Sequence, residues 1–379
     1  MIGQPDKQRQ TLQTSGLILL ILAMLWLGGC RVVSPEAQRV TLATPFPSST
    51  PTVTSSANAL IEPGTLITGV VSQSADTPTP PPGIAPALAS GVNGAIESMT
   101  LITRTASSEY YALTYWSDGY RVTGFLGRPR ADGVYPAIIY NRGGYREYGA
   151  LEGWEVSLFV EAGYVAVASQ YRGNAGSEGR EEHGGADVND VMNLIPLLKQ
   201  FPYVDPDRLG MMGHSRGGMM TYLALKQETL AGTHDIKAAV AVGGVSDAFM
   251  LVQETPFFLS VLGAKPQDAP ALYQARSATY WPELINAPLL IQHGEADSVV
   301  SVEQSRKLAK ALEAAGKTVK LITFPGEDHE LSGRYGGLPE ALAWFQSYLA
   351  DQGQDHTFES HRNAIGTMMQ WFQTHYRNR

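Results

Sequence analysis

Cysteine is almost absent from this sequence, since Cys30 is the only one among its 379 residues. A lone thiol cannot form a disulfide within the chain, and zinc sites made of thiolates need several cysteines. The sequence therefore excludes both a disulfide framework and a cysteine-based metal centre.

A surplus of positive charge is also lacking, because the formal net charge is −8. Nucleic-acid-binding proteins carry a basic footprint, so we expect no nucleic acid among the partners. The hydrophobic fraction of 44% and the charged fraction of 17% are ordinary for a globular protein. The length suits one large domain or two small ones.

The sequence has no long apolar run of the kind that spans a bilayer, which takes about 20 residues. Its longest candidate is the eleven-residue run Leu17 to Leu27, which follows Lys7 and Arg9. Such a run is typical of a secretory signal. It ends in Leu-Gly-Gly-Cys, which resembles a bacterial lipoprotein signal in which Cys30 is lipidated. We therefore expect an exported protein with a lipid anchor in the membrane; an uncleaved anchor and a plain signal peptide are the alternatives.

Lysine and arginine are missing between Arg39 and Arg104, where Thr, Ser and Pro tracts dominate. Such a segment cannot bury enough apolar surface to offset its chain entropy. The sequence thus predicts a lipoprotein-type signal peptide over residues 1–29, a disordered tether over 30–95 and a folded domain over 96–379.

The predicted domain opens with strand-like segments, and the stretch WSDGYR marks a tight hairpin turn. Short apolar runs then alternate with helical patterns. The runs are AIIY at 137, YVAVAS at 164, RLGMMG at 208, AAVAVG at 238, PLLIQHG at 288 and VKLITF at 319. Runs that are apolar on both faces suit buried parallel strands, so we expect an α/β fold with helices on both faces of a mostly parallel sheet.

One of the intervening helices has clear boundary signals. Ser301 and Gln304 form a capping-box pattern, Leu308 and Leu312 supply an apolar stripe, and Gly316 stands where a C-terminal glycine belongs.

The stretch Gly213-His214-Ser215-Arg216-Gly217 lies between a predicted strand and a predicted helix. This is the context of a nucleophile elbow, in which a sharp turn lifts the serine hydroxyl above the sheet. We therefore predict that Ser215 is a nucleophile.

A serine nucleophile needs a base, and the base needs an orienting carboxylate. In this fold the chain order is Ser, then Asp or Glu, then His. Asp297 and His329 each follow a predicted strand, so both are expected at the same sheet edge as Ser215. The alternative base is His356, which repeats the Asp-His pair but has no clear strand directly before it.

We expect the other acidic and histidine side chains near these positions to have structural rather than catalytic roles. We expect Glu295 to face solvent, His293 to satisfy a local hydrogen bond and His214 to pack beside the nucleophile. Asp187 and Asp190 are three residues apart at a helix start, where we expect them to cap the helix and bind an arginine such as Arg172. These are interpretations of sequence position alone.

Two donors must meet the oxyanion of a tetrahedral intermediate. The backbone amide of Arg216 is one candidate, and the amide of Gly144 or Tyr145 in the stretch NRGGYREYG is the other. The glycine pair is not a phosphate cradle, because no lysine and Ser/Thr follow it in P-loop spacing.

Taken together, YWSDGYRVTGFLGRP, YNRGGYREYG, YRGNAGSEGREEHGG, DPDRLGMMGHSRGGMM, APLLIQHGEADSVVSVEQ and FPGEDHEL resemble the catalytic domain of the prolyl oligopeptidase family of serine peptidases. The resemblance covers about 111 to 377. The family belongs to the α/β-hydrolase superfamily, so the resemblance implies that the domain over 96–379 is an α/β-hydrolase catalytic domain. It also implies hydrolysis of small peptide or ester substrates through an acyl-enzyme, no metal or organic cofactor, and a triad of Ser215, Asp297 and His329.

Two departures from the family pattern bear on the activity. A short tether is expected where family peptidases carry a β-propeller, and Arg142 stands where some members have an oxyanion-binding tyrosine. Both favour an esterase or an aminoacyl-ester hydrolase over a true oligopeptidase. A carboxylesterase or dienelactone-hydrolase-like esterase is therefore the second hypothesis. A non-catalytic binding lipoprotein on the same scaffold is the third hypothesis, and the sequence does not indicate an oligomeric state.

The aromatic-rich stretch 246–284 is expected after a strand at the catalytic edge. It has two interpretations: a lid or acyl pocket lined by Phe249, Phe257, Phe258 and Tyr273, or surface helices with those side chains in their own core.

Overall fold

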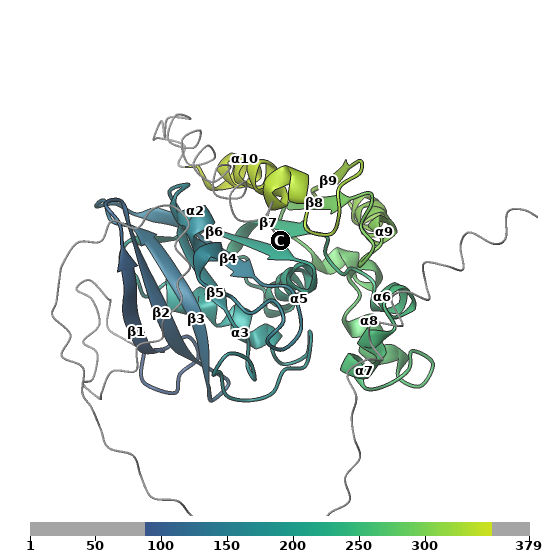
Figure 1. Ribbon diagram of the computed structural model, residues 1–379, viewed down its shortest axis with the longest axis horizontal. Helices are drawn as coiled ribbons and strands as arrows, with labels where there is room; N and C mark the ends of the chain where they lie inside the picture. Colours follow the sequence, from purple (N-terminus) through teal and green to yellow (C-terminus); the bar gives the residue numbers. More distant parts are fainter. Residues whose placement is uncertain (1–87, 351–379) are drawn as a thin grey trace, which may run out of the picture. The chain divides into compact units, whose positions relative to one another are not determined.

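The computed structural model describes residues 88–350, in which a nine-stranded sheet forms the centre (Figure 1). The strands lie in the order β1-β2-β3-β5-β4-β6-β7-β8-β9. Their bounds are β1 Ile96–Arg104, β2 Ser108–Ser117, β3 Tyr120–Pro129, β4 Tyr135–Asn141, β5 Val165–Ser169, β6 Val204–His214, β7 Ile236–Val242, β8 Leu289–Gly294 and β9 Val319–Phe324.

The first part of the sheet is antiparallel and the rest is parallel. β1, β2 and β3 form a meander, and β3 pairs antiparallel with β5. The β2–β3 turn has Asp118 at φ 50° and Gly119 at φ 80°, which is the conformation that Asp-Gly favours in a two-residue hairpin. From β5 across to β9 every pairing is parallel. The expected α/β class and hairpin are confirmed.

Helices cover both faces of this sheet (Figure 1). Their bounds are α2 Trp154–Val160, α3 Val188–Met192, α4 Leu194–Leu198, α5 Arg216–Ala231, α6 Ala248–Glu254, α7 Phe257–Leu262, α8 Pro270–Ala275, α9 Val302–Ala314 and α10 Leu338–Leu349, with 3-10 turns η1 Ala278–Tyr280, η2 Pro282–Leu284 and η3 Ser332–Gly337.

Alternation along the strands divides the interior into two cores. Ile139 of β4 belongs to a core with α5 and α9, whereas its neighbour Ile138 belongs to a core with α2 and α10. Successive strand side chains point to opposite faces, so a strand covered on both faces must be apolar throughout. All five residues of β5 are buried for this reason.

The folded region begins before the predicted boundary at residue 96. Gly94 donates a backbone hydrogen bond to Trp116 O, and Gln200 Nε2 donates to Gly94 O. Ala95 is fully buried. Residues 88–95 therefore belong to the domain, because the β2 edge and the Gln200 amide satisfy their backbone groups. Nothing in residues 88–350 forms a helix both long and apolar enough to cross a bilayer, and Cys30 lies outside the described residues.

The helix predicted after residue 301 is α9, and its ends differ in how well they follow the pattern. Gly316 ends it at φ 69°, as expected. The Ser301 hydroxyl accepts from Glu303 N at 3.2 Å, but the Gln304 side chain does not complete a capping box. Its Oε1 accepts instead from the amides of Ser246 and Asp247, after β7. Gln304 thus ties α9 to a distant loop.

Candidate active site

The turn after β6 is a strained elbow centred on Ser215. This residue has φ 56° and ψ −120°, a region that side chains rarely adopt and that is common at functional sites. A Cβ on Gly213 would lie 2.0 Å from Gly217 O, and one on Gly217 would lie 1.9 Å from Asn141 O. Both glycines are therefore required by close backbone approach, as the motif predicts.

The elbow places Ser215 at the start of α5. Its amide donates to Val242 O of the neighbouring strand β7 at 2.8 Å, which fixes the turn against the sheet. α5 begins at Arg216 and has sixteen residues, so its positive dipole end is directed at the serine. Negative charge that develops beside the hydroxyl would be stabilised there.

Asp297 and His329 meet at the same edge, at the ends of β8 and β9. His329 Nδ1 and Asp297 Oδ2 are 2.7 Å apart. The other carboxylate oxygen accepts from the amides of Val299 and Val300 at 2.8 and 2.9 Å. Burial alone would raise the pKa of Asp297, but hydrogen bonds from the histidines and from the backbone outweigh it and hold that pKa well below its ordinary value.

His293 is a second partner of this carboxylate that the sequence interpretation missed. Its Nε2 lies 3.0 Å from Asp297 Oδ2 and 2.8 Å from Val300 O, while its Nδ1 lies 2.6 Å from Ser305 Oγ. The expected local hydrogen bonds are present, and in addition the ring supports Asp297. Glu295 is exposed, as expected. The sequence signal for this contact was the four-residue spacing of His293 and Asp297.

Two observations place the His329 ring beside the nucleophile elbow. A Cβ on Gly243 would lie 3.2 Å from His329 Nδ1, and Gly243 directly follows the residue whose carbonyl binds Ser215 N. The rings of His214 and His329 are 4.9 Å apart between centroids. Residues 88–350 contain no hydrogen bond from the Ser215 hydroxyl to this ring, and such bonds commonly tighten only when substrate binds. His356 lies outside the described residues.

His214 packs on His329, as the sequence interpretation expects. Its Nε2 lies 2.9 Å from the backbone oxygen of His329. Burial lowers the pKa of His214, an effect that the nearby Glu330 carboxylate opposes. The neutral imidazole is therefore favoured at this position.

The two oxyanion candidates in the β4–α2 loop differ. The Tyr145 amide donates to Tyr148 O at 3.1 Å, so the prediction of Tyr145 as a donor is corrected: a small two-residue bridge already uses its N–H. The amides of Gly144 and Arg216 donate no hydrogen bond among the described residues. Gly144 has φ 77°, and a Cβ there would lie 2.0 Å from Tyr148 O. Gly144 and Arg216 are thus the candidates with free amides.

Arg142, which stands where some members of the resembled family have a tyrosine, is buried. Its guanidinium donates to Gln170 O at 3.0 and 3.2 Å and to Arg146 O at 3.0 Å. It also donates to Gly143 O at 3.1 Å. The side chain therefore joins the β4–α2 loop to the residue that follows β5, and backbone carbonyls engage its donors.

The side chain of Arg216 is buried and doubly paired. It binds Glu181 and, at 2.7 Å, Asp187, both from the β5–α3 loop. Burial lowers the pKa of Arg216, but the two carboxylates outweigh it and raise that pKa. Arg216 also donates to Gly144 O at 3.3 Å. The residue after the nucleophile thus joins the two oxyanion candidates to this loop.

The capping role expected of Asp187 is wrong. Asp187 makes no side-chain cap to α3, and its carboxylate accepts instead from Gly184 N and Gly185 N while it pairs with Arg216. Both amides come before the helix, so the carboxylate binds the Gly-Gly turn instead of the first turn of α3. Asp187 organises the loop rather than the helix.

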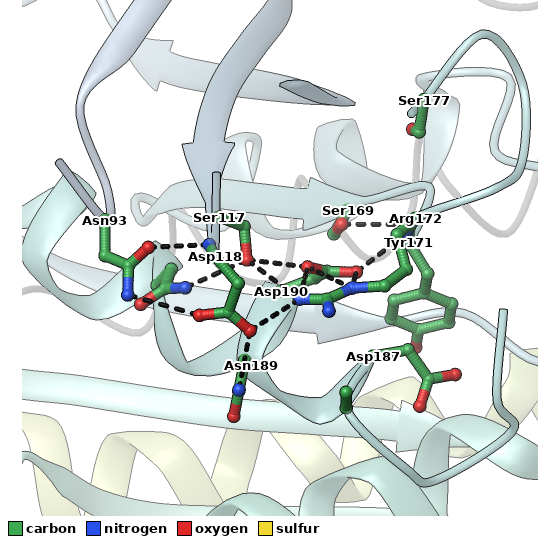
Figure 2. A network of polar contacts seen from close by, with 12 residues as sticks. Asn93, Ser117, Asp118, Ser169, Tyr171, Arg172, Ser177, Asp187, Asn189 and Asp190 are labelled. Carbon is green, nitrogen blue, oxygen red and sulfur yellow. Dashed lines mark hydrogen bonds and ion pairs between the residues drawn. The ribbon is translucent and has the colours of Figure 1, made fainter. Parts of the chain in front are cut away.

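The arginine partner expected for Asp190 is confirmed, and it anchors the root of the same loop (Figure 2). Arg172 Nη2 and Asp190 Oδ1 are 2.7 Å apart, and both side chains are buried. Arg172 also reaches Asp118 in the β2–β3 turn at 2.9 Å. Figure 2 shows this network joining the hairpin to the end of β5 and to α3.

The aromatic stretch 246–284 supports the core interpretation for two of its side chains, and the lid or acyl pocket stays a prediction. Tyr273 is fully buried and packs on Phe249, so these two belong to a local core. Phe257 of α7 lies 5.8 Å from the Tyr145 ring, and Phe258 lies 5.1 Å from His183. Phe257 is 55% exposed. α7 therefore borders the candidate site, beside the loop that carries Gly144.

Comparison with known proteins agrees with this architecture. A model of the prolyl oligopeptidase family matches residues 150–373. "Uncharacterized peptidase YtmA" of Bacillus subtilis is 35% identical over 215 residues, which are 55% of this chain and 82% of that protein. "Uncharacterized peptidase YuxL" of the same organism is 32% identical over 254 residues, 61% of this chain but 38% of that one.

A solved structure extends the comparison. Uncomplexed acylaminoacyl peptidase of Pyrococcus horikoshii superposes with a TM-score of 0.57 at 24% identity. The match covers 68% of this chain and 44% of that one. The similarity supports the fold, and the chain spans less than half of both this structure and YuxL.

Proposed function

Because the chain belongs to the prolyl oligopeptidase family and is a serine-type hydrolase, we propose that Ser215, His329 and Asp297 are its catalytic triad. The reaction is hydrolysis of peptide or ester bonds through an acyl-enzyme. The observation that carries the proposal is the 2.7 Å Asp297–His329 pair at the sheet edge where the strained Ser215 elbow stands.

The steps follow from the atoms available. His329 Nε2 takes the hydroxyl proton as Ser215 Oγ attacks the substrate carbonyl, and Asp297 holds the Nδ1–H tautomer. The amides of Arg216 and Gly144 stabilise the oxyanion, and loss of one such donor typically costs about 2.7–4 kcal/mol. His329 then gives its proton to the leaving group, and water hydrolyses the acyl-enzyme by the same route in reverse.

Replacement of Ser215 by Ala tests this mechanism. We expect turnover to fall by several decades, on the order of 10⁶ in a comparable triad. A fluorophosphonate probe should label the wild-type chain and not the variant. Ser347→Ala, on the exposed side of α10, is the matched control. Labelling at a site other than Ser215, or activity retained in Ser215→Ala, would refute the triad.

An esterase activity is the second candidate, and the buried Arg142 side chain favours it. Arg142 donates to the carbonyl of Arg146 in its own loop and to that of Gln170 after β5, so no tyrosine hydroxyl is available to the oxyanion at that position. Rates on short acyl esters and on peptide anilides, compared on one preparation, decide between the two substrate classes. Absence of both activities together with absence of probe labelling would favour the non-catalytic binding lipoprotein.

We also propose that the protein is exported and held at a membrane surface through Cys30. The support is the sequence alone: the apolar run before Leu-Gly-Gly-Cys. Each methylene of an inserted acyl chain adds about 0.8 kcal/mol to anchoring, so a multiply acylated cysteine would hold the chain firmly.

A further inference from the structure

We propose that His214, His329 and Glu330 form a site for zinc or a similar transition-metal cation, and that the bound cation inhibits the hydrolase. One ring nitrogen of each histidine and one carboxylate oxygen of Glu330 all lie within 4.8 Å of one another. His214 Nε2 and Glu330 Oε2 are 3.6 Å apart. The inhibitory part of this inference rests on the proposed function, whereas the site itself does not.

The donor set matches the chemistry of zinc. Two imidazole nitrogens and one carboxylate oxygen are a common protein ligand set for Zn²⁺, with a fourth position left for water. Mg²⁺ and Ca²⁺ prefer sites made of oxygen ligands. The cluster should therefore discriminate against both of these cations.

The environment of His329 is that of a metal-binding histidine. A ligating imidazole usually donates its other ring N–H to a carboxylate, which fixes the ring and raises its basicity. The 2.7 Å bond from His329 Nδ1 to Asp297 has this form. Since Nδ1 is engaged, the nitrogen available to a cation is Nε2, which is the atom that would take the serine proton.

The cation can enter from solvent without unfolding the site. The Glu330 side chain is 59% exposed, and those of His214 and His329 are partly exposed. Binding through His214 Nε2 replaces its contact with the backbone oxygen of His329. The proton of that nitrogen moves to His214 Nδ1, which has no hydrogen-bond partner within residues 88–350. The occupied His329 can then no longer act as a base.

Zinc binding and zinc inhibition can be measured separately. Ser215→Ala in the full chain is titrated with Zn²⁺ against a chromophoric chelator, and the wild type is assayed for ester hydrolysis with Zn²⁺, Mg²⁺ or Ca²⁺. We expect inhibition by Zn²⁺ alone and its reversal by EDTA. Each variant is referred to its own metal-free rate, so the inhibition constant does not depend on basal activity.

Glu330→Ala is the deciding variant, because its exposed side chain is not needed for folding. Removing one of three ligands should weaken zinc about tenfold or more in both measurements, by comparison with the loss known for outer-shell partners. Glu313→Ala, an exposed glutamate on α9, should change neither. The proposal is overturned if Zn²⁺ neither binds nor inhibits. It is also overturned if removal of the Glu330 side chain changes neither the zinc affinity nor the inhibition constant. If the wild type shows no hydrolase activity but Zn²⁺ still binds Ser215→Ala in a way that requires Glu330, the site is supported and only the proposed function is refuted.

Discussion

Replacement of Asp297 by Asn tests the orienting role of this carboxylate most sharply, because the structure dictates how the amide must lie. Two backbone amides, of Val299 and Val300, donate to Asp297 Oδ1 at 2.8 and 2.9 Å. An asparagine must keep its oxygen there, since the flipped amide would present N–H groups to two N–H donors. Each lost bond of this kind costs about 1–3 kcal/mol.

The asparagine NH₂ group then occupies the position of Oδ2. That position lies 2.7 Å from His329 Nδ1 and 3.0 Å from His293 Nε2. A donor beside Nδ1 forces His329 into the tautomer that carries its proton on Nε2, where it cannot accept a proton from Ser215. In a comparable triad this change lowers kcat by about 10⁴, which corresponds to about 5 kcal/mol of barrier.

The assay is steady-state hydrolysis of an activated acyl ester, with thermal unfolding measured on the same samples. We expect kcat to fall by about four decades while the unfolding transition stays cooperative. Asp207→Asn, at an exposed aspartate in the first part of β6, is the matched control and should keep wild-type kcat. A kcat for Asp297→Asn within tenfold of wild type would show that His329 does not depend on this carboxylate for its tautomer.

Three other changes have defined outcomes. Gly217→Ala places a Cβ 1.9 Å from Asn141 O, so we expect about 3 kcal/mol or more of destabilisation in a denaturant titration, and a smaller loss would contradict the close approach. Burial raises the pKa of Glu155 from 4.5 to about 7, so the folded state binds this proton more tightly than the unfolded state, and stability falls as the pH rises from about 4.5 through 7. Glu155→Gln should therefore stabilise the protein by up to about 3 kcal/mol at pH 8 and by little at pH 4, whereas an equal effect at both pH values would exclude this linkage. Cys30→Ala should abolish incorporation of radiolabelled fatty acid and partition into the detergent phase, and persistence of both would argue for another anchor.

The sheet could be predicted from sequence because its signals are local. A parallel strand covered on both faces is apolar at every position, and Val165–Ser169 has that form with all five residues buried. The hairpin turn has positive φ at Asp118 and Gly119, and the adjacent Asp-Gly pair is enough to predict it from sequence. Ser215 could be found because its Gly-x-Ser-x-Gly motif is local: the overlap that demands Gly213 is with Gly217 O, four residues along the chain. The overlap that demands Gly217 is with Asn141 O of the neighbouring strand, which the motif alone does not reveal.

Side chains that act over long separations could not be predicted in this way. Gln304 fits a capping box by spacing, yet its side chain binds the amides of Ser246 and Asp247, 58 and 57 positions away. Tyr145 has a suitable place in the glycine loop, but a bond to Tyr148 uses its amide. Local propensity cannot rank such competing partners, because the winner depends on which loops the sheet brings together.

The buried charges around Arg216 show how the fold connects these distant loops to the chemistry. A buried ion pair is often no better for stability than apolar packing, so two carboxylates on one buried guanidinium need a reason beyond stability. Glu181 accepts from Arg146 N as well as from Arg216, and Arg216 donates to Gly144 O. The same ion pairs thus fix both backbone segments whose amides are proposed to bind the oxyanion. Preorganised donors stabilise a transition state only when their positions are set in advance, and a charged network that is costly to rearrange sets them.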